Sequence, residues 1–268
     1  MECLVSVVEP EAIRNCLKHL NLKPQVVVLS SVDSTNDEAK RRIKSGLDGE
    51  LLVLSETQTR GRGRLNRTWL SPKGGLYFSL VIRPILKIES APLHGFLCAC
   101  AVVNALQKMG VDRVCLKWPN DVLISRCKVA GILSELVSRG NDDHLLVLGI
   151  GINLNTDTSV LPEEIRHSVT SIAEHLGNII SPEEMLCEVL SSIDRWTRLT
   201  RSEGSFNDVL DEWKRMSTTL GTRIRIDDGA RVYVGIAREL LDDGSLLVET
   251  ENGNVAFSIG DVTHLREG

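Results

Sequence analysis

The chain has 268 residues, of which 42% are hydrophobic and 25% are charged. This composition predicts a packed globular core, in one large domain or a large and a small one, and excludes wholesale disorder. The formal net charge of −5 argues against a protein whose whole surface binds nucleic acid.

The cysteines indicate a reducing compartment, and the histidines argue against a metal site. The seven cysteines are odd in number and include no Cys-x-x-Cys pair, so we expect buried, reduced thiols. The six histidines lack metal-ligand spacing, which argues against a zinc site. Met1 to Glu9 lacks the basic start of a signal peptide, and no apolar run reaches membrane-spanning length. We therefore expect a cytoplasmic protein without a membrane partner.

Hydrophobic periodicity predicts helices and strands in turn along the first half of the chain. We expect helices at residues 11–21, 37–44 and 93–109, the last apolar nearly all round and ended by Gly110. Aliphatic and β-branched runs predict strands at 26–29, 51–55 and 76–82. The stretch 57–69, rich in glycine and arginine, is expected to be a loop.

The second half continues with three strands, two helices and a region of short strands. The strands are expected at 114–117, 130–137 and 145–150. A capping box, Ser181-Pro182-Glu183-Glu184, opens a helix to about Leu199, and a shorter helix covers 206–216. Strands at 224–226, 232–237, 245–249 and 255–259, split by Asp-Gly and Asn-Gly turns, predict a small antiparallel barrel. The order predicts an α+β fold with domains at 1–219 and 220–268.

The polar turn before the second helix carries the first candidate site. Ser34, Thr35 and Asn36 lie where the turn enters the helix, so helix capping accounts for them. The alternative is a set of short donors and acceptors aimed at a neutral polar headgroup, such as a ureido ring.

The stretch from Gln58 to Arg67 contains four arginines, which repel one another and have little apolar surface to bury. An anion would reverse that balance, because glycine-flanked N–H groups and guanidinium forks bind phosphate oxygens. We therefore predict a loop that is disordered when empty and ordered over a nucleotide or acyl phosphate. Neither the dinucleotide-binding motif nor the P-loop motif is present. The alternative is a solvated basic loop or a nucleic-acid-binding arm.

Two lysines form the second cationic cluster. Lys117 begins Lys-Trp-Pro-Asn-Asp, and Lys128 begins Lys-Val-Ala-Gly-Ile. A lysine is a compact charge suited to an α-phosphate, and Asp121 could hold a lysine or a magnesium-bound water. A hairpin with surface lysines is the alternative.

A glycine-rich strand end is the last candidate. Gly149 and Gly151 would let a flat ligand approach the backbone, and Asn153 could hydrogen-bond an adenine or a phosphate. A strand that ends in a tight bend would also explain these residues.

Together and in this order, the clusters resemble the biotin–protein ligase family of the holocarboxylase synthetase type, from about Val26 to His264. The matching motifs are Asp33-Ser34-Thr35-Asn36, Gln58 through Arg64, Trp69-Leu70-Ser71-Pro72, Lys117-Trp118-Pro119-Asn120-Asp121, Lys128 through Leu133, and Gly149 through Leu154. The resemblance implies a mixed β-sheet with flanking helices, like the class II aminoacyl-tRNA synthetase core, and a C-terminal SH3-like β-barrel.

The resemblance also implies roles for individual residues. Those implied to bind biotin are Ser34, Thr35, Asn36, Gln58, Gly61, Arg62, Gly63, Lys128 and Gly131. Those implied to bind ATP are Arg64, Trp69, Lys117, Asn120, Asp121 and Asn153. Lys128, Arg64 and Arg62 are the implied catalytic residues, and Asp121 is the one candidate for magnesium.

The implied reaction uses ATP with Mg²⁺ to form biotinyl-adenylate, then transfers biotin to a lysine of a biotin carboxyl carrier protein. The family includes monomers and sheet-edge dimers, which leaves a homodimer open. The short stretch before the first strand has no room for the winged helix-turn-helix of repressor members, so we expect no DNA-binding role. Asn66 stands where many bacterial members have glycine, so the second half of the loop is expected to close differently.

Two rivals remain. A lipoate–protein ligase or octanoyltransferase would share the catalytic fold, and a thiol-dependent transferase would need a placed Cys–Lys pair, which the adjacent Cys127 and Lys128 resemble. A nucleic-acid-binding module could use the arginine loop and the barrel, although the acidic net charge and the lack of interleaved aromatics argue against it.

Overall fold

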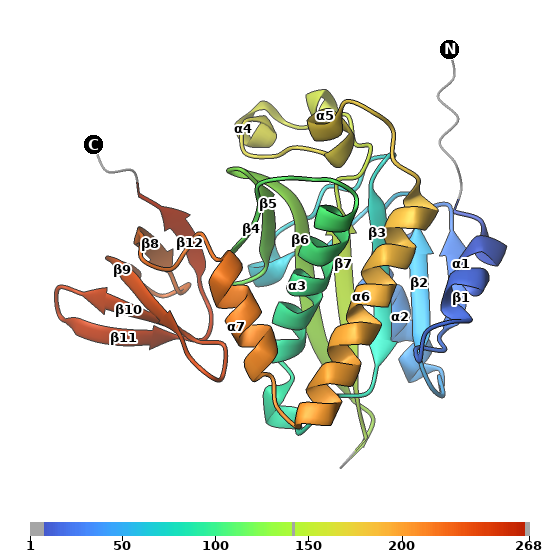
Figure 1. Cartoon of the computed structure of the whole chain (residues 1–268), viewed down its shortest axis with the longest axis horizontal. Helices are drawn as coiled ribbons and strands as arrows, with labels where there is room; N and C mark the ends of the chain where they lie inside the picture. Colours follow the sequence, from blue (N-terminus) through green and yellow to red (C-terminus); the bar gives the residue numbers. More distant parts are fainter. Residues whose placement is uncertain (1–7, 141–142, 266–268) are drawn as a thin grey trace.

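The computed structural model describes residues 8–140 and 143–265, and it contains two β-sheets. Figure 1 shows the larger sheet flanked by helices and the smaller one, formed by the C-terminal strands, beside it. The predicted α+β class is confirmed. The predicted division after residue 219 lies between the last helix, which ends at Met216, and the strand that begins at Arg223. Cys3 and most of the N-terminal stretch 1–9 lie outside the described residues.

The larger sheet has seven strands in the order β1-β2-β3-β7-β6-β5-β4. Their bounds are β1 Gln25–Leu29, β2 Leu51–Ser55, β3 Leu76–Ile82, β4 Val114–Lys117, β5 Asp121–Ile124, β6 Cys127–Ser138 and β7 His144–Ile152. β1 and β2 are parallel and the other neighbours are antiparallel, so the sheet is mixed as predicted. β2 and β3 are buried at every residue because helices cover both faces at the centre of the sheet.

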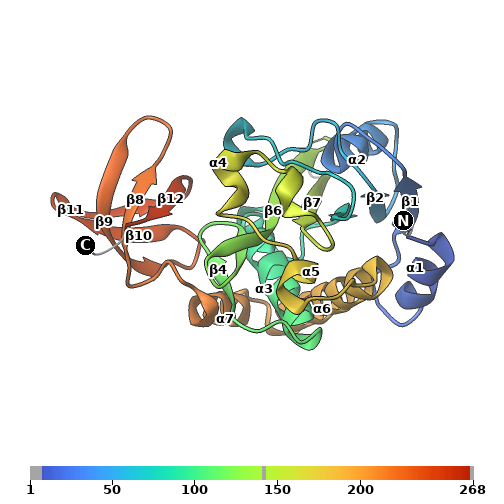
Figure 2. The same ribbon diagram turned by 90° about the horizontal axis from the view of Figure 1, so that it is seen from above.

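The two faces carry different helices. The bounds are α1 Pro10–Leu17, α2 Thr35–Lys44, α3 Leu93–Lys108, α4 Glu163–Arg166, α5 Ile172–Leu176, α6 Pro182–Glu203 and α7 Asn207–Met216. Figure 2 shows α2 on the opposite side of the sheet from α3 and α6. Alternate residues of β2 accordingly enter different apolar clusters, with Leu52 packed among the residues under α3 and Val53 packed with Ile43 of α2. α2 therefore brings Ser34, Thr35 and Asn36, at the end of the predicted polar turn, onto this face of the sheet.

Several sequence-based predictions needed correction. β5, β12, α4 and α5 were not predicted, and the first helix ends at Leu17 rather than at residue 21. Ser181 does cap α6, since its Oγ accepts the Glu184 N–H at 3.2 Å, but the reciprocal half of a capping box is missing there. The complete box forms instead at α5, between Ser171 and Glu174. α4 and α5 have only four and five residues, too few for a helical periodicity to be recognised in the sequence.

The smaller sheet is antiparallel, with the order β11-β10-β9-β8-β12. Its strands are β8 Arg223–Asp227, β9 Val232–Leu240, β10 Leu246–Thr250, β11 Gly253–Phe257 and β12 Asp261–His264. Among the described residues no ladder joins β11 to β12, so hydrogen bonds do not close the sheet into the predicted barrel. The buried Trp118 ties the two parts of the fold together, because its backbone N–H donates to Thr219 Oγ1 at 3.0 Å and its Nε1 donates to Gly244 O at 3.1 Å.

The thiol prediction is only partly confirmed. Cys98 and Cys100 are buried in α3, and burial raises the pKa of Cys98 to about 12. The other described cysteines are free but half-buried rather than buried, and they are Cys16, Cys115, Cys127 and Cys187. Across residues 8–140 and 143–265, every helix is too short or too polar to cross a membrane.

Buried His94 makes stability depend on pH. Its Nε2 accepts the Ile85 N–H at 3.0 Å, which requires the neutral imidazole, and burial lowers its pKa from 6.5 to about 4. The unfolded chain therefore binds the proton more tightly. Neutral His94 therefore contributes about 3 kcal/mol to the free energy of unfolding. This contribution is fully present above pH 6.5 and is lost as the pH falls towards 4. Urea unfolding between pH 4.5 and 7 should show this slope in the wild type and a much flatter one in His94→Gln. An unchanged slope in the variant would assign the pH dependence to other groups.

Candidate active site

A cavity of about 920 Å³, counting its open mouth, lies over the strands β6 and β7. It is bounded by the N-terminus of α2, the arginine loop 57–69 and the β4–β5 hairpin. Thirteen of the predicted site residues line it: Ser34, Thr35, Asn36, Gln58, Arg62, Gly63, Arg64, Trp69, Lys117, Asn120, Asp121, Lys128 and Gly131. Segments far apart in sequence therefore meet at one place.

The α2 end of the cavity presents neutral polar groups. Ser34 caps the helix by accepting the Asp37 N–H at 3.4 Å, so the capping explanation of this residue is correct. Its hydroxyl proton remains available to the cavity. Gln58 Oε1 accepts the Thr35 N–H at 2.8 Å, and Gln58 Nε2 donates to Ser71 Oγ at 2.8 Å, which fixes the direction of the Gln58 amide. This end suits an uncharged ligand group with both donors and acceptors.

The opposite wall carries Lys128 at the start of β6. Its Nζ lies 2.5 Å from Asp121 Oδ1 and 5.1 Å from the centroid of the Trp69 ring. Lys128 and Asp121 are partly exposed, at 30% and 21% of their side chains, so the ammonium can reach a ligand while it keeps its carboxylate partner. The Asp121 carboxylate thus holds a lysine, one of the two roles predicted for it.

The glycines on β6 and β7 make room for side chains of the protein itself. A Cβ at Gly151 would lie 2.6 Å from Trp69 Nε1, and one at Gly149 would overlap Asn36 Oδ1. Gly131 is also close to the indole, with Trp69 Cζ3 3.0 Å from its Cβ position. The flat group that these glycines admit is therefore Trp69, whose buried Nε1 has no hydrogen-bond partner among the described residues.

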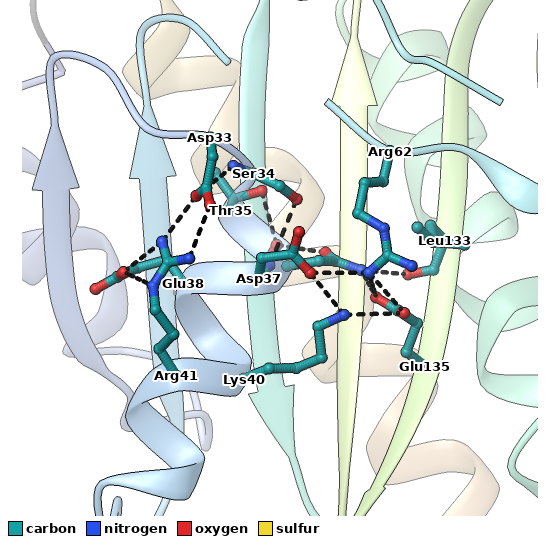
Figure 3. A network of polar contacts seen from close by, with 12 residues as sticks. Asp33, Ser34, Thr35, Asp37, Glu38, Lys40, Arg41, Arg62, Leu133 and Glu135 are labelled. Atoms are coloured by element: carbon teal, nitrogen blue, oxygen red, sulfur yellow. Dashed lines mark hydrogen bonds and ion pairs between the residues drawn. The ribbon is translucent and has the colours of Figure 1, made fainter. Parts of the chain in front are cut away.

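The arginine loop has a defined path because carboxylates elsewhere in the chain offset its charge. Arg62 pairs with Asp37 at 2.8 Å and with Glu135 at 3.1 Å, as Figure 3 shows. Arg67 pairs with Asp261 at 2.5 Å. We predicted that the loop orders only over an anion because its arginines repel one another. That prediction did not include these carboxylates, which lie far from the loop in sequence. Closure over a ligand stays a prediction.

Asn66 takes a conformation that glycine also favours. Its φ is 58°, in the left-handed region that asparagine tolerates better than most residues. Asparagine at this position can therefore adopt a turn that glycine also favours, and a different closure of the second half of the loop stays a prediction.

Arg64 differs from the other loop arginines because no ion pair involves it among the described residues. Its guanidinium lies 6.0 Å from the centroid of the Trp118 ring, and burial lowers its pKa although Asp121 and Asp261 oppose this shift. Burial also acts against the charge of Arg62, but Glu135 and Asp37 prevail and raise its pKa. Arg64 is thus the loop cation best placed to pair with an incoming anion, whereas the environment of Arg62 supports anchoring rather than its predicted catalytic role.

Two predicted residues do not line the cavity. Gly61 is buried, and a Cβ there would overlap Trp69 O, so close packing requires a glycine at this position. Its role in binding biotin stays a prediction. Asn153 is also buried, and its Nδ2 donates to Thr170 O at 3.2 Å. Its role towards adenine stays a prediction.

Lining residues to which the sequence analysis assigned no role are Leu65, Arg67, Thr68, Trp118, Pro119, Ile132, Leu133, Ile150, Gly260 and Asp261. Gly260 and Asp261 come from the C-terminal part, which lies far along the chain from every quoted motif.

Magnesium has no suitable donor set of its own in the described residues. No group of three or more potential ligands gathers there, and Asp121, the predicted ligand, is paired with Lys128. A magnesium ion is therefore expected to enter with the phosphates of a nucleotide, as it often does.

Comparison with known proteins agrees with these features. Residues 28–153 match the biotin/lipoate A/B protein ligase family, and residues 219–265 match the biotin protein ligase C-terminal domain. A biotin–[acetyl-CoA-carboxylase] ligase of Paracoccus denitrificans is 32% identical over 88% of this chain and 98% of its own length. The bifunctional ligase/repressor BirA of Bacillus subtilis is 32% identical over 84% of this chain and 69% of its own.

The fold comparison gives the same result. The structure of a biotin protein ligase from Aquifex aeolicus, in complex with biotin and ATP, has a TM-score of 0.76 and 31% identity to this chain. The match covers 91% of this chain and 99% of the other. The similarity therefore includes the C-terminal sheet as well as the sheet that carries the cavity.

Proposed function

This chain belongs to the biotin–protein ligase family, and from that premise we propose that it joins biotin to ATP as biotinyl-adenylate and then transfers biotin to a lysine of a biotin carboxyl carrier protein. One observation supports this assignment above the others. Neutral hydrogen-bonding groups line one end of a single cavity, and two cations, Lys128 and Arg64, lie at the other end.

The neutral end would bind the ureido ring. Ser34 and Thr35 are nearly fully buried yet line the cavity, so a ligand group there is taken out of water and must be matched donor for acceptor. A ureido ring offers a carbonyl that can accept the Ser34 proton and N–H groups that need acceptors.

The cationic end would hold the biotin carboxylate and the α-phosphate of ATP. When the carboxylate oxygen attacks the α-phosphorus, pyrophosphate leaves and negative charge spreads over the phosphate oxygens. Lys128 is held by Asp121 and Trp69, so its charge is already in place before the reaction, which is the arrangement that lowers such a barrier most. Arg64 would add the second positive charge from the loop, and Lys117 lies on the same wall.

The second step would be the attack of a carrier lysine amine on the mixed anhydride. The amine forms an amide bond to the biotin carbonyl carbon and AMP leaves. Residues of loop 57–69 line the cavity, and we propose that the loop closes over the intermediate between these steps and limits hydrolysis by excluding water.

The thiol-dependent rival is disfavoured by the position of Cys127. Its Sγ lies 3.8 Å from His167 O, and the residue does not line the cavity, so it does not form a nucleophilic pair with Lys128. Lipoate in place of biotin is disfavoured by the polar end of the cavity, because lipoate has no ureido ring. The free thiols support a cytoplasmic setting, and a homodimer stays a prediction.

The direct test uses the purified chain with magnesium–ATP and either biotin or lipoate, without a carrier. Mass spectrometry of the bound product is expected to find biotinyl-adenylate. Lipoyl-adenylate alone would keep the fold and the chemistry but overturn the substrate. The absence of both would overturn the function.

A further inference from the structure

A segment outside the quoted motifs holds the main chain of Lys128. Val169 pairs with Lys128 as a parallel bridge. The Lys128 N–H donates to Ser168 O at 2.8 Å, and the Thr170 N–H donates to Lys128 O at 3.0 Å. Figure 1 shows the chain between α4 and α5, which contains these residues, across one end of the larger sheet. Both main-chain groups of this lysine therefore bond to residues 168–170.

The contacts of this segment with the rest of the fold are few. Residues 168–170 are exposed or half-buried, so water competes for their main-chain hydrogen bonds. The segment is next attached to the sheet at Ile172, whose N–H donates to Asn153 O at 3.0 Å. Thr170, which contacts Lys128, lies two residues before that attachment.

The Asn153 side chain closes this gap. Its Nδ2 donates to Thr170 O at 3.2 Å, and its main-chain N–H donates to Val129 O at 2.8 Å. Asn153 is only 5% exposed, so water is poorly placed to replace Nδ2 as the partner of the carbonyl. Asn153 thus joins the residue next to Lys128 in β6 to the residue whose N–H holds Lys128.

We propose that Asn153 is a positioning residue for Lys128 in the adenylation step: by holding Thr170 it fixes the main chain from which the ammonium projects. This inference rests on the proposed function, since it concerns the step in which Lys128 faces the α-phosphate. The pair with Asp121 at 2.5 Å fixes only the tip of a flexible side chain. The base must be fixed as well, because a displacement of about 1 Å at the reacting groups can slow a reaction by about 100-fold.

Asn153→Leu removes the Nδ2 donor while it keeps a side chain of similar size. Thr170 O then loses its partner, and the segment can move away from Lys128. We expect pyrophosphate release at saturating ATP and biotin to slow by about 10- to 100-fold, while the KM for ATP changes by less than about threefold. A contact between Asn153 and adenine would give the opposite pattern, with a raised KM and a smaller change in the saturated rate.

Asn155→Leu is the matched control for a loss of structure alone. Asn155 lies two residues further along the chain, where its Nδ2 donates to Ile180 O at 2.8 Å and its Oδ1 accepts the Ile180 N–H at 2.9 Å. These bonds do not involve the segment that holds Lys128. The control should lose at least as much stability in thermal unfolding, yet release pyrophosphate within about twofold of the wild type. An equal loss of rate in both variants would contradict the specific role of Asn153.

The decisive measurement adds Asn153→Leu to Lys128→Ala. A residue that acts through Lys128 has no ammonium left to position, so the second substitution should lower the remaining rate by less than about threefold. A merely structural role, or a separate contact with ATP, would lower it by the same factor as in the wild type. If Asn153→Leu does not fold, Asn153→Asp, which keeps the size and polarity but lacks the donor, takes its place in the same comparison.

The outcomes separate this inference from the proposed function. A wild-type rate in folded Asn153→Leu, or independent losses in the double variant, would overturn the role of Asn153 while the wild type still makes biotinyl-adenylate. A wild type that makes no biotinyl-adenylate would overturn the function itself.

Discussion

Replacing Lys128 with alanine is expected to slow pyrophosphate release from ATP and biotin by about 100- to 1,000-fold. The ammonium is the cation held most firmly at the cationic end of the cavity, 2.5 Å from Asp121 and over the face of Trp69. Charge that develops on the α-phosphate would lose its pre-positioned partner, and a water molecule would have to reorient in its place. The measurement is a continuous assay of pyrophosphate with saturating biotin.

Two further variants make the Lys128 result interpretable. Lys128→Ala alone leaves the Asp121 carboxylate without its partner, so Lys128→Ala with Asp121→Asn tests whether the loss comes from a repelled phosphate rather than from the missing ammonium. Lys73→Ala removes an exposed lysine between Trp69 and β3 and should leave the rate unchanged. Normal pyrophosphate release by folded Lys128→Ala would rule out the proposed role.

Replacing Arg64 with alanine should shorten the lifetime of the bound adenylate by about 10- to 100-fold, with a smaller effect on its formation. Arg64 is half-buried and has no carboxylate partner among the described residues, so the phosphate of the adenylate would be its natural counter-charge. The measurement is the amount of biotinyl-adenylate that remains on the protein at intervals after rapid gel filtration.

Arg60→Ala is the matched control for that prediction. It removes the same charge from the same loop, but the Arg60 side chain is 80% exposed and its ion pair with Asp33 is long at 3.6 Å. The control should retain the adenylate as the wild type does. Equal retention by Arg64→Ala would mean that the loop closes over the intermediate without this arginine.

The environments of Arg62 and Arg64 also show a difference that a sequence motif cannot reveal. The alternation of glycine and arginine in the loop predicted anion binding but made the two arginines equivalent. In the fold they differ, because Arg62 lies over α2 and β6, where Asp37 and Glu135 neutralise it, while Arg64 lies against Trp118. Neither carboxylate is near the loop in sequence.

The glycines of β7 show a similar limit. Gly149 and Gly151 were predicted to let a flat ligand approach the sheet, but the groups next to them are the side chains of Asn36 and Trp69. Spacing along a strand reveals that a position tolerates no Cβ. It does not reveal which neighbour occupies the space, since that neighbour arrives from another segment.

The sequence by itself determined the elements and the chemistry of the site. Period-two and apolar runs predicted the central strands, turn residues marked the C-terminal strands, and thirteen of the predicted residues line one cavity. These features are local, because burial of a strand, the start of a helix and the charge of a loop depend on residues within a few positions.

Only the tertiary structure decided which charges are offset and which parts of the chain complete the cavity. Glu135 meets Asn36 across 99 residues, and Asp261 meets Arg67 across 194. Such pairs form because the order of strands in the sheet and the docking of the C-terminal part bring them within hydrogen-bond distance. The periodicity of the sequence does not contain this information. Only the fold shows that carboxylates hold Arg62 and that Asn153 does not line the cavity.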